Sequence, residues 1–192
     1  GESKVRETIE MLFQYIKEHN LPQELRLIPE INIKKIIKSD SHKYVFLEDE
    51  DQNDYIIPLK RTIDLSNINL HKQKKYHKFL QDHPSYKIRQ LEITDRNIQK
   101  QMLELFHTWK NMRGKTEKEV SPELLPLKKL FKFSAYLNLF SLGLYIDNKL
   151  IGFVIDERVK EPYVVGHFIK ANLLYPGIYE VLNKVSADMH YK

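Results

Sequence analysis

The sequence predicts an α/β fold in which a mixed, mostly antiparallel sheet is flanked by helices. Apolar residues recur at helical spacing in several segments, and over the last third of the 192 residues they alternate with polar or small residues, as in strands. The hydrophobic content of 42%, with eleven tyrosines and nine phenylalanines, indicates a folded protein rather than a disordered one. This length suffices for one sizeable core, or for one domain and part of another.

The first 58 residues predict a helix, a strand, a second helix and a hairpin. The first helix carries five apolar residues at helical spacing, which are Val5, Ile9, Leu12, Phe13 and Ile16. A strand is expected over residues 25–28, and the Pro-Glu step at 29–30 suits the start of a second helix. Strands over 44–47 and 55–57 would flank an acidic turn over 48–54.

A basic helix and a short strand are expected next, and we place a domain boundary near Leu59. The helix is anchored by apolar residues such as Leu70 and Phe79, and the following strand covers residues 86–91. The helix carries four lysines, which are Lys72, Lys74, Lys75 and Lys78.

Two further helices are expected before the sheet continues. The first begins after Thr94, a suitable N-cap, and carries apolar residues at helical spacing, which are Ile98, Met102, Leu105, Phe106 and Trp109. A polar loop over 113–121 leads to a second helix over 122–139, in which Pro126 disturbs the first turns.

The last third predicts three strands and a final helix. Strands over 142–146 and 150–155 are joined by a tight turn at Asp147 and Asn148. Strict alternation in the third strand, over 163–170, places one set of side chains on one face, namely Tyr163, Val165, His167 and Ile169. The other face then carries Val164, Gly166, Phe168 and Lys170. The final helix would bury Ile178, Val181, Leu182, Val185 and Met189.

Composition excludes several classes of function. The chain has no cysteine, so disulfides, thiolate catalysis and thiolate metal sites are excluded. No apolar run approaches the roughly 20 residues of a membrane helix, and the N-terminus lacks a signal peptide, so we expect a cytoplasmic protein. No metal is expected, because His71 and His77 lie six residues apart and do not align on one helical face. The net charge of +5 suits acidic partners.

Three stretches of the sequence carry a resemblance to a known family. They are LSNINLHKQKKYHKFLQDHPSYKIRQL (65–91), FSLGLYIDNKLIGFVI (140–155) and VVGHFIKANLLYPGIYEVLNKVSA (164–187). In this order they resemble the phosphatidylglycerol lysyltransferase C-terminal domain family, whose members have two lobes of the acyl-CoA N-acyltransferase (GNAT) fold in tandem. The resemblance implies that residues 1–58 are the end of a first lobe and residues 59–192 a second lobe without its last strands.

Three features depart from the pattern of that family. Gln73 and Lys74 follow Lys72 where a Lys-Arg-Asn run is usual, and Ile169 replaces the usual acidic residue before Lys170. The sequence ends at Lys192, before the family's strand with an Asn-Arg-Glu motif.

The resemblance implies an acyl or aminoacyl transferase whose donor is an acyl-CoA or an aminoacyl-tRNA. The acceptor would be an amine or hydroxyl on a lipid or small molecule. The amides of a helix N-terminus attract anions, so the donor is expected at Gly177, Ile178 and Tyr179, with help from Tyr175 and Lys170. The alternative is that the Pro-Gly step at 176–177 only ends a loop and that the tyrosines pack.

Acyl transfer needs a base for the nucleophile, and three residues are candidates. His167 is the first choice because its ordinary pKa lies near 6.5, while Asp156 and Glu157 end the preceding strand. The alternative is a structural histidine and two solvated carboxylates.

The lysines of the basic helix suggest a different class of function. Lys72, Lys74, Lys75 and Lys78 would contact tRNA or anionic lipid headgroups, which suits a peripheral position at a membrane, or they form an ordinary solvated face. The alternative function is therefore a non-catalytic basic module of GNAT shape that binds tRNA, other nucleic acid or anionic membrane. An open sheet edge would also allow a homodimer.

Overall fold

The computed structural model describes residues 2–39, 42–50, 55–64, 69–160 and 162–191. The chain divides into two compact units, Gly1–Ile56 and Ile57–Lys192.

Among its described residues the first unit has the α-helices α1 (Glu2–Glu18) and α2 (Glu30–Ser39). Their buried apolar side chains are Ile9 and Ile16 of α1 and Ile36 of α2. The second helix confirms the start predicted at residues 29–30.

The strands predicted in the first unit are wrong for the described residues. Residues 25–28, 44–47 and 55–57 form no strand. Leu27 has a φ of 57°, a left-handed value that interrupts an extended segment. These residues pair with no described strand, and half of the 44–47 segment is exposed: Val45 is 88% exposed, whereas Tyr44 and Phe46 are half-buried. The predicted acidic turn lies partly outside the described residues.

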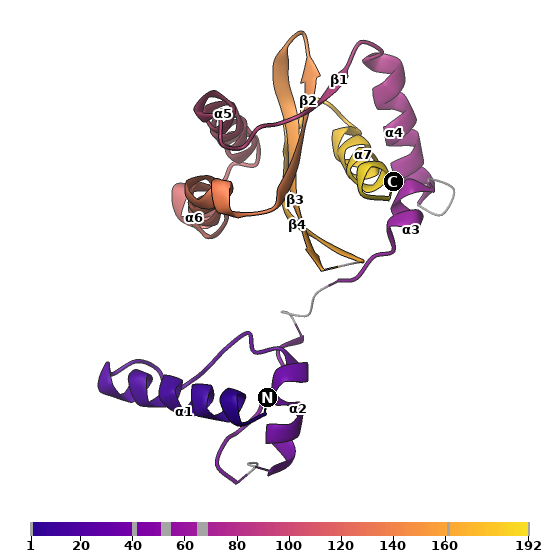
Figure 1. The fold of residues 1–192 in the computed structure, drawn as a ribbon. Coiled ribbons are helices and arrows are strands. Elements are labelled where there is room, and N and C mark those ends of the chain that lie inside the picture. Colours follow the sequence, from indigo (N-terminus) through magenta and orange to yellow (C-terminus); the bar gives the residue numbers. More distant parts are fainter. Residues whose placement is uncertain (1, 40–41, 51–54, 65–68, 161, 192) are drawn as a thin grey trace. The chain divides into compact units, whose positions relative to one another are not determined.

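The second unit is a four-stranded antiparallel sheet covered by helices on both faces, which confirms the predicted fold class (Figure 1). The strands are β1 (Lys87–Gln90), β2 (Leu139–Ile146), β3 (Lys149–Lys160) and β4 (Tyr163–Ala171), in the order β1-β2-β3-β4. The helices are α3 (Leu59–Ile63), α4 (Leu70–Asp82), α5 (Arg96–Met112), α6 (Glu117–Phe133) and α7 (Ile178–Tyr191), with a short 3-10 turn, η3 (Ser134–Tyr136).

The core has one layer on each face of the sheet. Helices α5 and α6 cover one face and bury Phe106 and Leu127 against Phe153 and Ile155 of β3. Helices α4 and α7 cover the other face with a second cluster, which includes Phe79, Leu144, Ile151 and Leu182. In α7 the predicted burial is wrong for Met189, which is 38% exposed, while Ala187 is buried.

The hairpin turn between β2 and β3 is confirmed. Asp147 and Asn148 have φ values of 49° and 60°, and a two-residue turn of type I′ requires positive φ at both positions.

The N-cap of α5 lies one residue later than predicted. Asp95, and not Thr94, caps the helix by accepting a hydrogen bond from the backbone N–H of Asn97 at 2.7 Å. The hydroxyl of Thr94 instead donates to Glu92 at 2.6 Å.

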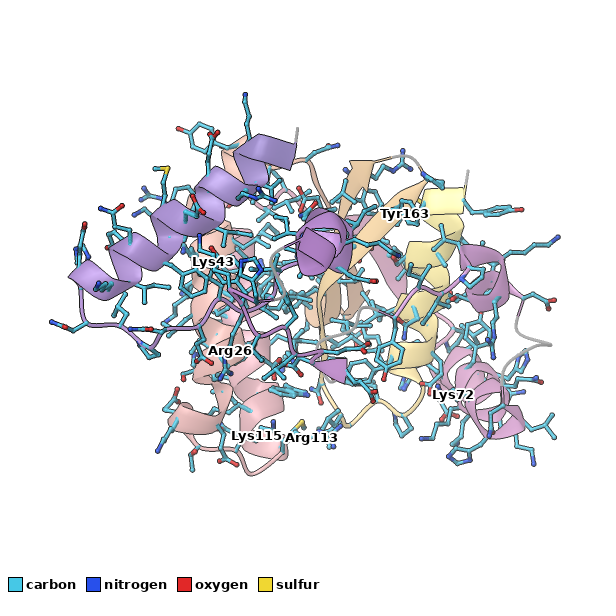
Figure 2. All side chains as sticks on the ribbon, turned by 90° about the horizontal axis from the view of Figure 1, so that it is seen from below. Arg26, Lys43, Lys72, Arg113, Lys115 and Tyr163 are labelled. Atoms are coloured by element: carbon cyan, nitrogen blue, oxygen red, sulfur yellow. The ribbon has the colours of Figure 1, made fainter. Side chains whose placement is uncertain are left out.

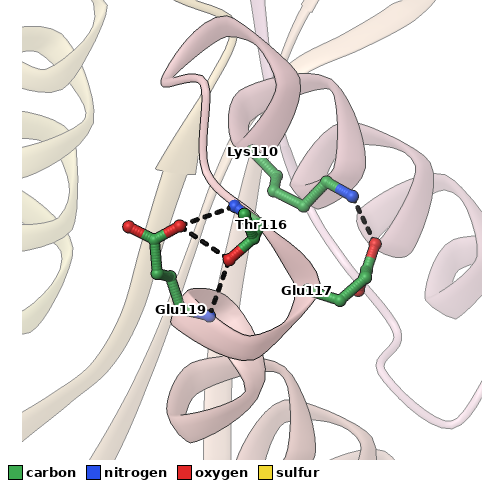
Figure 3. Close-up of polar contacts among 4 residues, drawn as sticks. All are labelled: Lys110, Thr116, Glu117 and Glu119. Carbon is green, nitrogen blue, oxygen red and sulfur yellow. Dashed lines mark hydrogen bonds and ion pairs between the residues drawn. The ribbon is translucent and has the colours of Figure 1, made fainter.

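Helix α6 begins five residues earlier than predicted and ends six residues earlier. Thr116 and Glu119 form a capping box in which each side chain satisfies a backbone N–H of the other residue (Figure 3). Lys110 of α5 also pairs with Glu117 in the first turn (Figure 3). The helix tolerates Pro122 because the hydroxyl of Ser121 donates to the carbonyl of Lys118, which proline cannot reach with an N–H.

Candidate active site

A β-bulge in β4 positions the principal candidate residue. Ile155 of β3 pairs with Phe168, but the next residue, Asp156, pairs with Gly166, so His167 is the extra residue in β4. The strict alternation predicted for this strand is therefore wrong at His167. Because the bulge interrupts the alternation, His167 and Phe168 line the same cavity although they are neighbours in sequence.

That cavity has a volume of about 560 Å³ and lies between β4 and α6. Its walls are Pro122, Glu123, Pro126 and Leu130 from α6 and His167, Phe168, Ile169 and Lys170 from β4. Two of the residues predicted for catalysis or donor binding, His167 and Lys170, thus share one cavity.

His167 is held by Glu157 of β3. The Nε2 atom of His167 lies 2.8 Å from Oε2 of Glu157, and the two side chains are 31% and 24% exposed. A carboxylate accepts hydrogen bonds, so the geometry places the proton of a neutral imidazole on Nε2 and leaves Nδ1 as the free acceptor. This is the arrangement in which a carboxylate orients a histidine base and stabilises its protonated form.

Lys170 forms the second polar feature of the cavity. Its residue exposure is 8%, and its ammonium pairs with Glu123 of α6. The same nitrogen lies 3.7 Å from the centroid of the Trp109 ring in α5. A buried ammonium needs such partners, because its hydration is lost on folding. Sequence reasoning missed Glu123 and treated Trp109 only as core, because both contacts join residues far apart in the chain.

Asp156 is separated from the other two catalytic candidates. It faces α7, where it accepts hydrogen bonds from Ser186 Oγ at 2.5 Å and from His190 Nε2 at 3.1 Å. Arg158 donates to the other ring nitrogen of His190 at 3.4 Å. Asp156 is 4% exposed, so the contacts give it a role in holding α7 on the sheet.

The predicted donor site at the start of α7 is closely packed. Gly177 has a φ of 92°, and a Cβ atom there would lie 2.1 Å from the carbonyl oxygen of Lys75 in α4. Gly177 and Ile178 are buried, and the N–H of Ile178 donates to the carbonyl of Tyr175 at 3.2 Å. The close approach of α4 is thus sufficient reason for glycine here. The predicted binding of a donor at this turn stays a prediction.

The two tyrosines of the predicted donor site are half-buried. The ring of Tyr175 packs edge-on against His83, with ring centroids 5.1 Å apart. Burial raises the pKa of Tyr179 above its ordinary value, although the nearby backbone N–H of Ala171 acts in the opposite direction. Tyr179 is therefore a neutral hydrogen-bonding group near pH 7.

The four lysines of α4 are exposed. Lys72 can be followed in Figure 2, and Lys74, Lys75 and Lys78 are also exposed. Lys78 pairs with Asp82 one turn later at 2.9 Å.

Two findings concern other kinds of site. In the part of the chain that the structure describes, no three His, Asp or Glu side chains gather as metal ligands would. No described helix combines the length and apolarity that crossing a bilayer requires.

Comparison with known proteins agrees with the sequence motifs. A family model described as phosphatidylglycerol lysyltransferase, C-terminal, matches residues 1–189. No curated protein matches the chain. A solved structure of a conserved protein of unknown function from Bacteroides thetaiotaomicron is similar, with a TM-score of 0.71 and 17% identity. The similarity covers 83% of this chain and 53% of that one, so this chain spans about half the length of the Bacteroides protein. The chain belongs to the phosphatidylglycerol lysyltransferase C-terminal family.

Proposed function

We propose that this chain catalyses aminoacyl transfer in the cavity between β4 and α6. The observation that carries the proposal is the contact of 2.8 Å between His167 and Glu157 at the bulge in β4. With Nε2 bound to Glu157, Nδ1 of His167 takes the proton from the attacking hydroxyl or amine. The acceptor's oxygen or nitrogen then bonds to the carbonyl carbon of the donor, and the bond from that carbon to the leaving oxygen breaks. The protonated histidine returns its proton to the leaving group.

Lys170 is the proposed electrophilic partner of this base. It lies three residues after His167 and lines the same cavity, where Glu123 and Trp109 fix its ammonium. A fixed positive charge stabilises the oxyanion that develops on the carbonyl under attack. In this proposal Asp156 does not touch the substrate, because it is engaged with α7.

The donor in this proposal is an aminoacyl-tRNA, and the acceptor is a hydroxyl group on an anionic lipid. Membership of the lysyltransferase family supports both. The close packing of Gly177 against Lys75 favours an aminoacyl ester over acyl-CoA, because it leaves no room for a phosphate at that residue's Cα. We also propose that residues 1–58 end a first GNAT-like lobe and that residues 59–192 form the second.

A transfer assay tests the proposed function. Radiolabelled lysine is followed from lysyl-tRNA to phosphatidylglycerol vesicles, and acetyl-CoA serves as the competing donor. His167→Gln should lower the rate on the order of a hundredfold, because general base catalysis contributes about that much. Glu157→Gln should lower it less, since the base stays in place but loses its orientation and charge. His42→Gln, an exposed histidine in the first unit, is the matched control. Transfer that is equally fast in all three variants would contradict the assignment.

A second candidate function rests on the exposed lysines of α4. In this alternative, Lys72, Lys74, Lys75 and Lys78 bind the phosphates of tRNA, and the cavity performs no chemistry. Replacing all four by glutamine should then weaken tRNA binding. The slope of the logarithm of the binding constant against the logarithm of the salt concentration should become shallower by roughly 3. If His167→Gln leaves tRNA binding intact and no transfer occurs in the wild-type protein, this alternative holds.

A further inference from the structure

The end of the sheet at which β3 and β4 join, opposite the turn between β2 and β3, carries a group of exposed apolar side chains (Figure 1). Six residues from three segments belong to this group, which we call the apolar end: Phe133, Tyr136, Leu137, Val159, Tyr163 and Val165. Tyr136 is 86% exposed, and Tyr163, labelled in Figure 2, is 54% exposed. Single apolar residues are ordinary on a protein surface, but a group of them in one place marks a surface that binds something.

Strand pairing brings the three segments of the apolar end together. Leu139 at the start of β2 pairs with Glu157 of β3, and Glu157 pairs on its other side with Val165 of β4. Neighbouring strands lie about 4.8 Å apart, so Leu139 and Val165 are separated by roughly 10 Å. Leu137 comes two residues before Leu139, and Tyr163 comes two residues before Val165, at the start of β4.

The apolar end borders the candidate active site. Val165 lies directly opposite Glu157, whose carboxylate holds His167. Residues opposite each other on neighbouring strands share a face of the sheet, so Val165 and Glu157 lie on the same face. In α6, Leu130 lines the cavity and Phe133 follows three residues later, which places both on one side of the helix. Anything that rests on the apolar end therefore lies next to the cavity.

The exposed charges around the apolar end are positive among the described residues. Lys129 and Lys132 lie exposed in the last two turns of α6, and neither has an ion-pair partner in the part of the chain that the structure describes. The ammonium of Lys132 lies 5.5 Å from the centroid of the Phe133 ring. Arg158 near the end of β3 is a third exposed cation, and residues 160–161 of the sequence carry one charge of each sign. Aromatic and apolar side chains beside such cations are typical of protein surfaces that lie on anionic membranes.

We propose that the apolar end rests on the surface of a bilayer that contains anionic lipid. Tyr136 and Tyr163 then enter the headgroup region, and Lys129 and Lys132 contact lipid phosphates. The apolar side chains leave water in this arrangement, and the two lysines meet charges of opposite sign. The link to catalysis rests on the proposed function, because the docked protein holds the cavity at His167 next to headgroup hydroxyls, which are the proposed acceptors.

Vesicle sedimentation tests this surface with the full chain. Binding is compared between vesicles that contain phosphatidylglycerol and vesicles of phosphatidylcholine alone, at low and at high salt. The wild type should bind the anionic vesicles, and salt should weaken that binding. Tyr136→Gln/Tyr163→Gln should bind them at least about tenfold more weakly, because two rings no longer leave water. Lys129→Gln/Lys132→Gln should also lose at least about tenfold, together with most of the preference for anionic lipid.

A transfer assay separates this proposal from the proposed function. Lysine transfer to phosphatidylglycerol vesicles is compared with transfer to the water-soluble headgroup, glycerophosphoglycerol. The double tyrosine variant should raise the apparent KM for vesicles and leave transfer to the soluble headgroup unchanged. If the wild type transfers nothing, the proposed function fails while vesicle binding still tests the apolar end. His167→Gln should bind vesicles as the wild type does in either case.

Leu174→Gln is the matched control for vesicle binding, because Leu174 is 74% exposed but follows the other end of β4. It should bind vesicles as the wild type does. Three results overturn the proposal: no binding of the wild type to anionic vesicles at low salt, equal binding by the double tyrosine variant, or loss of binding only when the four lysines of α4 are replaced by glutamine. A dimer in analytical ultracentrifugation that the double tyrosine variant abolishes would also overturn it, since a second copy would then cover the apolar end.

Discussion

The substitution Gly177→Ala should be unusually costly, because it puts a methyl group where the backbone of α4 passes. The new Cβ would lie 2.1 Å from the carbonyl oxygen of Lys75 and 3.0 Å from Cβ of Phe79. To restore ordinary contact, α4 and α7 must separate by about 1 Å, and overpacking of this kind costs roughly 1–3 kcal/mol. The φ of 92° adds a penalty for a residue with a side chain, about 1–2 kcal/mol. Together these predict a loss of roughly 2–5 kcal/mol in the free energy of unfolding.

Gly114→Ala is the matched control for this prediction. Gly114 also has a positive φ, 62°, but nothing lies within 4 Å of the position of its Cβ. It should therefore lose only the backbone term, about 1–2 kcal/mol. The measurement is urea denaturation followed by far-ultraviolet circular dichroism. Equal losses in the two variants would refute the close contact between α4 and α7, and would reopen the space beside Gly177 to a phosphate.

Three further changes have expected outcomes. Asp156→Ala removes the acceptor of two hydrogen bonds from α7 and should lower the free energy of unfolding, measured by urea denaturation, by roughly 2–4 kcal/mol. Its control, Asp188→Ala, breaks one partly exposed ion pair and should lower it by less than about 1 kcal/mol. Glu123→Gln leaves Lys170 without its countercharge and should lower the melting temperature, while a variant of unchanged stability would show that the ammonium is solvated. Burial raises the pKa of Tyr179 in the folded protein. The contribution of Tyr179 to the free energy of unfolding is therefore complete below the ordinary tyrosine pKa of about 10 and is lost as the pH rises through the folded pKa. Tyr179→Phe should reduce the loss of stability that is measured between neutral and alkaline pH.

Local signals in the sequence were enough to predict much of the second unit. Helix α5 follows from five apolar residues at helical spacing, and the turn at Asp147 and Asn148 follows from the side chains that tolerate positive φ. The start of α6 could also have been found, because Thr116 and Glu119 have the spacing of a capping box. The prediction gave more weight to Pro126, which the helix accommodates on an exposed face.

The wrong predictions share a physical cause: the elements concerned depend on hydrogen-bond partners that are distant in sequence. An extended apolar segment such as residues 44–47 becomes a strand only when a neighbour completes its hydrogen bonds, and no described segment does so. The bulge at His167 is a property of the pairing between β3 and β4, and alternation within one strand carries no sign of it.

In the candidate site, too, contacts between residues near in sequence could be predicted and contacts between distant residues could not. His167 and Glu157 could be named from the sequence as neighbours in a hairpin, and the structure brings them into contact. The contact between Lys170 and Glu123 joins residues 47 positions apart, which no local pattern reveals. Asp156 and Glu157 were indistinguishable in sequence, and pleating sends them to opposite faces of the sheet.

Trp109 is the only tryptophan in the chain, and its indole ring lies 3.7 Å from the ammonium of Lys170. The energy of indole emission responds to the electric field across the ring, and the ammonium of Lys115 also lies over this ring, at 5.5 Å from its centroid, so the position of Lys170 contributes to the emission wavelength together with Lys115. A molecule that enters the cavity and draws Lys170 toward itself should therefore shift that emission. The emission of this single indole can therefore be measured, without a label, to test whether a ligand displaces Lys170 beside β4.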